Sequence, residues 1–291
     1  MNHLRTADGV EICYWIHRCG DGPSSAVLLI HGAASNHTRW SEFTRRTKLR
    51  DSYDLVLPDM RGNGRSMCRG RLDLGKWCED LVAILDAEGY ETVIAVGHSL
   101  GAQIALHFAA AHPRRVRALA LIDPVVRQAL TGKPKRLKIM EPLVRLGISI
   151  LRMLNRIGLQ RREFPLMDLE ALDAETREAM QGDQPQEMLV RRYSATGLIL
   201  EHMPIANYLQ QLVASISPLP ELERIDVPTL VLESIGAENM DRARSRAEFA
   251  RLQSVELVKI QATHWPLTER PEEVRQAIES WIERLPTSAQ G

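Results

Sequence analysis

The sequence predicts an α/β fold with a mostly parallel central sheet that is covered by helices on both faces. Two observations carry this prediction. Short apolar runs recur along the chain and end in loop-forming residues, and segments with a helical spacing of apolar residues lie between them. Strands that are apolar on both faces are typical of parallel sheets buried between helices. The 291 residues, of which 44% are hydrophobic, suffice for a sizeable core.

Strands and helices are assigned by the period of their apolar residues. The predicted strands are 11–17, 26–30, 55–57, 92–96, 118–122, 229–232 and 255–260. The predicted helices are 74–87, 102–112, 242–252 and 271–285. Because strands alternate with helices along the chain, neighbouring strands are expected to pair in parallel.

Between residues 125 and 217 this alternation breaks, since helical patterns interrupted by prolines replace the strands. We therefore predict a core domain of residues 1–124 and 218–291 and a helical cap, or lid, of residues 125–217. The first part of the cap, residues 132–162, carries nine Lys/Arg and one acid, and residues 163–187 carry eight acids and one base. A basic amphipathic helix can bind a membrane surface. The favoured interpretation is that the two halves neutralise each other within the cap.

Charge and composition exclude several classes of partner. Lys+Arg and Asp+Glu both number 37, so the formal net charge is +0 and no global field attracts nucleic acid or an anionic membrane. The N-terminus lacks the apolar core of a signal peptide, and no run of about eighteen apolar residues follows. We expect a cytoplasmic protein without stable membrane insertion. Its four cysteines lack metal-ligand spacing, so reduced thiols and no metal are predicted.

The most informative pentapeptide is Gly97-His98-Ser99-Leu100-Gly101, which follows a predicted strand and precedes a predicted helix. In this context G-x-S-x-G presents a serine on a tight, strained turn. The glycines permit close approach of neighbouring backbone, and the start of the helix favours negative charge nearby. Ser99 is therefore the candidate nucleophile. The alternative is a glycine-rich turn whose serine only caps the helix.

With these residues in this order, the chain resembles the α/β-hydrolase superfamily, in its serine esterase and lipase-like branch, over nearly the whole sequence outside the insertion. The resemblance implies a helical cap inserted after the sixth strand. His31-Gly32-Ala33-Ala34 is similar to the family's oxyanion loop, which implies that the backbone N–H groups of Ala33 and Leu100 stabilise the oxyanion. The family-like segment that begins at Asp59 is interpreted as a scaffold turn in which Asp59 and Arg61 are structural.

The resemblance places the base in the loop after the last strand, where His264 precedes a family-like Glu-Arg-Pro-Glu-Glu run. The acid departs from the family pattern, because no Asp stands at the expected place after the preceding strand. We favour Glu238 there, since Glu serves in some triads. Asp123, at the end of an earlier strand, is the alternative acid, and Asp241 and Glu233 are further candidates.

Ser, His and a carboxylate with two N–H donors suffice for acyl transfer without a metal or an organic cofactor. A serine nucleophile disfavours the epoxide hydrolase and haloalkane dehalogenase branches, which need a carboxylate there. The leading hypothesis is a carboxylic ester hydrolase, monomeric or homodimeric, for a small to medium hydrophobic substrate. Its acyl or aryl group is expected under a flexible roof of apolar cap helices with methionines such as Met140, Met153 and Met203. Substrate contacts are expected from His31, Gly32, His98, Trp40 and Trp265.

Other functions share these motifs. Within the superfamily they are a carbon–carbon bond hydrolase for aromatic ring-fission products, a thioesterase, an acyltransferase and a cofactor-free perhydrolase-like enzyme. A noncatalytic receptor would bind its ligand in the same pocket. A lipid-surface protein would use the basic stretch 132–162 and bind vesicles in a salt-sensitive way.

Overall fold

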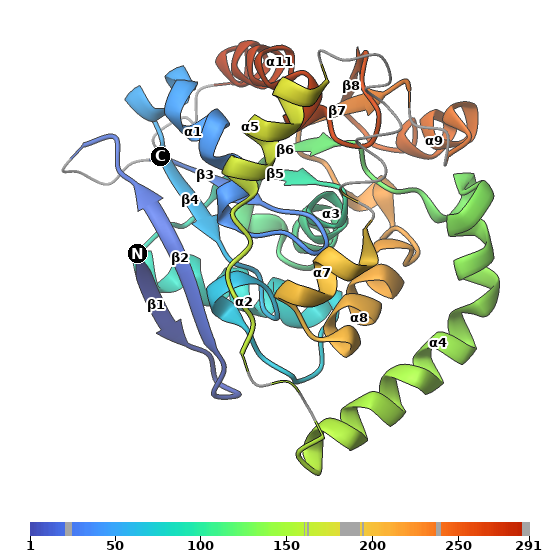
Figure 1. Cartoon of the computed structure of the whole chain (residues 1–291). Helices are drawn as coiled ribbons and strands as arrows, with labels where there is room; N and C mark the ends of the chain where they lie inside the picture. The colour runs from blue at the N-terminus through green and yellow to red at the C-terminus, as the bar shows by residue number, and fades with distance from the viewer. Residues whose placement is uncertain are drawn as a thin grey trace.

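The computed structural model describes residues 1–20, 25–159, 161, 163–180, 193, 195–236 and 240–286. Its centre is an eight-stranded sheet in the order β1-β2-β4-β3-β5-β6-β7-β8 (Figure 1). β1 pairs with β2, and β2 with β4, in antiparallel fashion, whereas the strands from β4 to β8 are parallel. The predicted α/β fold with a mostly parallel sheet is therefore confirmed.

All seven predicted strands are present, with ends that differ by a few residues. The strands are β1 (Asn2–Arg5), β2 (Glu11–His17), β3 (Ala26–Ile30), β4 (Asp54–Pro58), β5 (Val93–His98), β6 (Val116–Ile122), β7 (Thr229–Ser234) and β8 (Val255–Ile260). β1 was not predicted. It is an edge strand of four mostly polar residues that are half-buried and exposed in turn, so it lacks the apolar run by which the other strands are identified.

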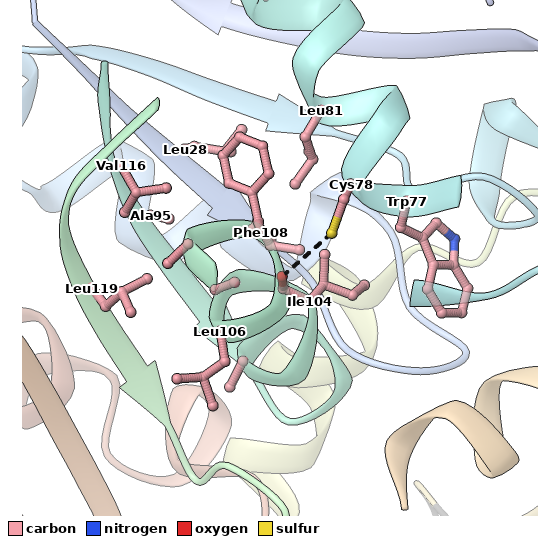
Figure 2. Packing of buried hydrophobic residues seen from close by; sticks show 14 of the residues in the cluster. Leu28, Trp77, Cys78, Leu81, Ala95, Ile104, Leu106, Phe108, Val116 and Leu119 are labelled. Atoms are coloured by element: carbon pink, nitrogen blue, oxygen red, sulfur yellow. Dashed lines mark hydrogen bonds between the residues drawn. The ribbon is translucent and has the colours of Figure 1, made fainter. Parts of the chain in front are cut away.

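Two apolar clusters cover the two faces of the sheet. On one face lie α2 (Leu74–Glu88) and α3 (Leu100–Ala111). Figure 2 shows part of this cluster, in which Phe108 of α3 and Leu81 of α2 gather over the strand residues Leu28 and Ala95. On the other face α11 (Pro271–Glu283) packs together with α1 (Ser41–Arg46). Burial on both faces explains why strands β3 to β6 are nearly continuous apolar runs.

Between β6 and β7 the described residues form helices and no strand. They are α4 (Gly132–Arg156), α5 (Leu169–Ala179), α7 (Thr196–His202) and α8 (Ile205–Ser215). The predicted helical insertion after the sixth strand is therefore present, and its division from the core as a separate domain stays a prediction. α8 packs on α3 and α4, whereas α5 packs on the 3-10 helix η1 (His37–Trp40) and on α10 (Pro266–Glu269). In the described part of the chain no helix is long and apolar enough to cross a bilayer.

The ion pairs of α4 and α5 bear on the predicted neutralisation of the basic half of the cap by the acidic half. Two of the acids of α5 pair with arginines outside the cap, Asp173 with Arg39 and Glu170 with Arg45. The acid of α4, Glu141, pairs with Arg127 and with Arg145 of its own helix. α4 and α5 pack on different parts of the protein, α4 on α8 and α5 beside η1 and α10, and the neutralisation of the two halves of the cap stays a prediction.

The turn from β5 into α3 brings backbone segments into direct contact at two glycines. A Cβ on Gly101 would overlap the carbonyl oxygen of Ile30, and a Cβ on Gly97 would overlap the carbonyl of Gly101. Only glycine fits at these two positions, because the obstructing atoms are backbone and cannot move aside. The start of α3 therefore lies against the end of β3.

Gly101→Ala is expected to lower the free energy of unfolding by about 3 kcal/mol, because the added methyl group forces β3 and α3 apart. Urea unfolding followed by circular dichroism measures the effect. The matched control is Gly147→Ala in α4, where a Cβ meets open space and alanine should stabilise the helix by about 0.5–1 kcal/mol. Equal effects of the two substitutions would contradict the close approach at Gly101.

Candidate active site

Ser99 stands at the turn between β5 and α3 in a strained backbone conformation. Its φ of 54° lies in the left-handed region that residues other than glycine rarely adopt. The Ser99 N–H donates a hydrogen bond to the carbonyl of Ile122 at the end of β6 (3.0 Å). This bond and the glycine contacts of the turn hold the residue in place. The predicted strand, turn and helix around this serine are all present.

Two hydrogen bonds connect Ser99 to a histidine and a carboxylate from distant parts of the chain. The Ser99 Oγ lies 2.9 Å from Nε2 of His264, which stands between β8 and α10. The Nδ1 of the same ring lies 2.5 Å from Oδ2 of Asp123, the residue after β6. The imidazole can donate from Nδ1 to the carboxylate and accept from the hydroxyl at Nε2. This is the arrangement in which a histidine acts as a general base toward a serine.

Asp123 is buried and its conformation is strained, with a φ of 43°. Besides His264, its carboxylate accepts hydrogen bonds from the Ser234 backbone N–H (3.2 Å) and the Arg242 guanidinium (3.3 Å). Burial alone would raise the pKa of Asp123, but the hydrogen bond and charge of His264, together with Arg242, outweigh it and hold the pKa below its ordinary value. The group is therefore a carboxylate at neutral pH.

The structure favours the alternative acid over the preferred one. Glu238 lies outside the described residues. Asp123 faces the Nδ1 of His264, and because this nitrogen carries a single hydrogen, it donates to one carboxylate. The two further candidates have other roles. Glu233 is bound by the Arg246 guanidinium (2.9 Å), and Asp241 caps the N-terminus of α9 (Arg242–Phe249). The prediction of either as the acid was wrong, because each carboxylate is already engaged by a neighbour close in sequence.

The predicted oxyanion loop lies beside the serine. A Cβ on Gly32 would stand 3.4 Å from the Cβ of Ser99, so the loop and the turn are in contact. Among the described residues, the backbone N–H groups of Ala33 and Leu100 have no hydrogen-bond acceptor. Leu100 is the first residue of α3, where such N–H groups are free to bind a negative charge. The pair can therefore donate to an oxyanion.

A glutamine of the cap, Gln211, holds the oxyanion loop in place, and sequence analysis missed it. Its Oε1 accepts a hydrogen bond from the Ala34 N–H (2.7 Å), and its Nε2 donates to Oδ1 of Asn63 (3.0 Å). Ala34 has a φ of 49°, so this bond stabilises another strained residue. A glutamine inside a helical pattern gives no sequence signal for a partner 177 positions away.

The histidines of the two motif loops hold backbone groups. His31 accepts a hydrogen bond from the Met60 N–H at Nε2 (2.9 Å) and donates from Nδ1 to the Gly32 carbonyl (2.8 Å). His98 donates from Nε2 to the carbonyl of His264 (3.1 Å). Burial lowers the pKa of His31 to about 4, and burial together with His264 lowers the pKa of His98 to about 3.

Both rings are therefore neutral and buried at neutral pH. The predicted substrate contact is wrong for His31, because the loop occupies both of its ring nitrogens. For His98 the structure gives a positioning role, since its hydrogen bond fixes the backbone of the base His264.

The two tryptophans have different positions. Trp40 is fully buried in the hydrophobic core, with its ring edge against Phe43, so its predicted role as a wall of the substrate site is wrong. Trp265 is half-buried. Its ring lies edge-on to His264 at 5.8 Å and stacks on Tyr193 at 5.4 Å, so it borders the site as predicted.

A buried ion pair connects the cap to the loop that carries His264. Arg39 donates to both carboxylate oxygens of Asp173 in α5 (2.6 and 2.8 Å) and to the Thr268 hydroxyl of α10 (2.9 Å). Tyr193 also donates to Asp173, and its ring lies under the Arg39 guanidinium. The cap and the histidine loop are thus held together next to the site. The sequence does not reveal this group, because its members are far apart in the chain.

The methionines predicted as a roof separate into two groups. Met203 is buried and lines a small pocket at the oxyanion loop, together with Ala34, Ser35 and Ile199. Met140 and Met153 are 52% and 58% exposed on α4, so their predicted place in the roof is wrong. In the described residues no three His, Cys, Asp or Glu side chains come together as ligands for a metal ion.

Comparison with known proteins relates the chain to one family. The family model described as "Alpha/beta hydrolase family" matches residues 27–277. Lipase LipV of Mycobacterium tuberculosis is 35% identical over 121 residues, which are 42% of this chain and 44% of the lipase. The chain thus spans less than half of the length of the first curated relatives that it matches.

Other relatives align over more of the chain. A 2-hydroxy-6-oxononadienedioate/2-hydroxy-6-oxononatrienedioate hydrolase of Pseudomonas putida is 29% identical over 223 residues, 73% of this chain and 71% of that protein. Among solved structures, a thermophilic esterase from Thermogutta terrifontis has a TM-score of 0.69 at 20% identity and covers 99% of this chain and 100% of its own. This structural likeness supports the fold.

The contribution of Asp123 to stability is expected to depend on pH. Because its folded-state pKa lies below the unfolded value of about 3.9, the carboxylate stabilises the fold above that pH, and this stabilisation is lost as the pH falls through the folded-state pKa. The difference in unfolding free energy between wild type and Asp123→Asn should therefore shrink from pH 5 to pH 3. Urea unfolding at each pH measures it, with the exposed Asp226→Asn as control. A difference that grows toward pH 3 would contradict this sign.

Proposed function

This chain belongs to the alpha/beta hydrolase family, and we propose that it is a hydrolase that cleaves a carboxylic ester of a small to medium hydrophobic substrate through an acyl-enzyme on Ser99. The observation that carries the proposal is the continuous hydrogen-bonded line from the Ser99 hydroxyl through His264 to Asp123, with distances of 2.9 and 2.5 Å. Two backbone N–H donors beside the hydroxyl support it.

In the proposed reaction, Nε2 of His264 takes the proton of the Ser99 hydroxyl while Oγ attacks the ester carbonyl. The N–H groups of Ala33 and Leu100 donate to the oxyanion of the tetrahedral intermediate. Protonated His264 then gives its proton to the leaving alcohol. A water molecule repeats the sequence on the acyl-enzyme and releases the acid. The carboxylate of Asp123 keeps the imidazole in the tautomer that accepts at Nε2, and it stabilises the imidazolium.

The surroundings of the serine support a hydrophobic acyl or aryl group. Trp265 and Tyr193 form an aromatic edge beside His264, and the apolar side chains of Ile199 and Met203 line the pocket at the oxyanion loop. A relative named as a lipase agrees with this choice.

A carbon–carbon bond hydrolase is the second candidate. Relatives named as hydrolases of an oxononadienedioate align over 73% and 79% of this chain, more than the lipase does. Such a dioate carries two carboxylates, which need cationic or hydrogen-bonding partners when they are buried. Two arginines of the site, Arg39 and Arg242, already pair with Asp173 and Asp123. Because these two arginines already bind carboxylates of the protein, a neutral ester fits the site better than a dioate.

Hydrolysis of nitrophenyl esters of increasing acyl length tests the proposal. The wild type should turn over these esters, with a maximum at one chain length set by the pocket. Ser99→Ala should lose at least about 10³-fold in kcat, since the nucleophile is gone. Circular dichroism of the variant checks that it is folded. Equal turnover by the variant would remove Ser99 as the nucleophile. Folded wild type that leaves every ester intact but cleaves a ring-fission dioate would favour the second candidate.

Two carboxylate variants test which residue is the acid that binds His264 in the reaction. Asp123→Asn is expected to reduce kcat by about 10³ to 10⁴-fold, because an amide cannot stabilise the imidazolium and favours the wrong tautomer. Glu238→Gln, which removes one carboxylate from the chain in the same way, should change kcat by less than about threefold. Both are measured on the best ester of the series. The reverse ranking would restore Glu238 as the acid.

A further inference from the structure

The outer face of α4 carries a continuous apolar stripe. Figure 1 shows α4 as a long helix along the edge of the molecule, away from the central sheet. Six large apolar side chains, each between 47% and 72% exposed, follow one another at alternating steps of four and three residues. They are Ile139, Leu143, Leu146, Ile150, Met153 and Ile157. Side chains with this spacing lie on one side of a helix, so the exposed residues form a single stripe.

The opposite side of α4 faces the protein. Ile148 is the buried residue of this helix, and α4 packs on α8. Glu141 binds the Arg127 guanidinium (2.7 Å), which also donates to the Ile216 carbonyl (2.8 Å). The helix is therefore fixed by one side, and its apolar stripe is turned outward.

Positive charge accompanies the stripe. α4 contains seven of the 37 Lys/Arg residues of the chain and one of the 37 acids. Lys138, Arg145 and Arg152 follow at steps of seven residues, so they share one flank of the stripe, and Arg156 lies one turn further on. Apart from Arg145, no cation of α4 has a carboxylate partner among the described residues. The net charge of zero thus conceals a strongly basic helix.

We propose that α4 docks this protein on the surface of an anionic phospholipid bilayer, as an amphipathic helix lying in the plane of the membrane. The apolar stripe would enter the boundary between headgroups and acyl chains, and the flanking Lys and Arg side chains would bind lipid phosphates. Docking of this kind needs a large apolar face beside cations on one helix, and α4 has both.

Charge distinguishes this partner from a second copy of the chain. Pairing two such stripes would bring two basic helices together, which like-charge repulsion disfavours, whereas an anionic lipid surface neutralises the same charges. The inference does not rest on the reaction at Ser99, because the stripe lies outside the residues that form the candidate site.

Vesicle co-sedimentation of the full chain tests the proposal. The probes are vesicles of phosphatidylcholine alone and vesicles with about 30% phosphatidylglycerol, at about 0.1 M salt. We expect binding to the anionic vesicles, at least about tenfold weaker binding to the neutral vesicles, and weakening at about 0.5 M salt because the charges are screened.

Matched variants show whether vesicle binding depends on α4 or only on the total positive charge of the protein. The triple variant Lys138→Gln, Arg152→Gln, Arg156→Gln should bind anionic vesicles about 100-fold more weakly, since each cation near the surface contributes about fivefold. The control triple variant Lys48→Gln, Arg50→Gln, Lys259→Gln removes the same charge from exposed positions elsewhere and should bind like wild type. Ile150→Glu should abolish binding through the stripe itself, with the unfolding midpoint unchanged.

Two results would overturn the inference. One is equal vesicle binding by the two triple variants, which would assign any binding to net charge alone. The other is a dimer in solution that Ile150→Glu dissociates, together with no binding of the wild type to anionic vesicles. That outcome would assign the stripe to a second copy of the chain.

Discussion

The contact between the start of α3 and the end of β3 is the constraint on which the site depends. Without a side chain at Gly101, the helix backbone reaches the carbonyl of Ile30. The same approach places the first N–H of α3 beside the oxyanion loop that follows β3, and it forces Ser99 to a φ of 54°. Among the described residues, the non-glycine positions with positive φ are Ala34, Ser99 and Asp123, one after each of the neighbouring strands β3, β5 and β6. Backbone strain is therefore concentrated where the proposed chemistry takes place, and the surrounding sheet maintains it.

Most of the fold can be predicted from the sequence, because a strand buried between two helical layers must be apolar throughout, and this pattern needs no knowledge of its neighbours. β1 is an exception to this pattern. Its residues alternate between partial burial and exposure at the sheet edge, so Asn2 and Arg5 carry no strand signal of their own. The helices of the insertion are equally visible as patterns. Their packing partners are not, since α5 and α8 contact segments that precede them by more than 100 residues.

The residues of the candidate site likewise fall into those that the sequence predicts and those that it does not. Ser99 and His264 are predictable because a local motif surrounds each of them. The acid cannot be predicted in this way, because carboxylates occur at the ends of both β6 and β7. Only the strand order shows that β6, which Asp123 follows, is the neighbour of β5, which Ser99 follows. Burial likewise decides between functional and structural roles. Trp40 is in a loop-like stretch after the oxyanion motif, yet its ring lies wholly within the core. No sequence pattern separates it from Trp265, which borders the site.

The cap consists of a polar, fixed part and an outward, apolar part. The inner side of α8 presents Asn207, Gln210 and Gln211, each hydrogen-bonded to core backbone. Leaving such buried groups unpaired costs about 1–3 kcal/mol each, so they hold α8 in one position over the oxyanion loop. The buried pair of Arg39 and Asp173 does the same for α5. A freely moving apolar roof is inconsistent with these bonds. The apolar surface expected to face the substrate lies instead largely on the outer side of α4, where shape and charge suit a partner larger than a substrate.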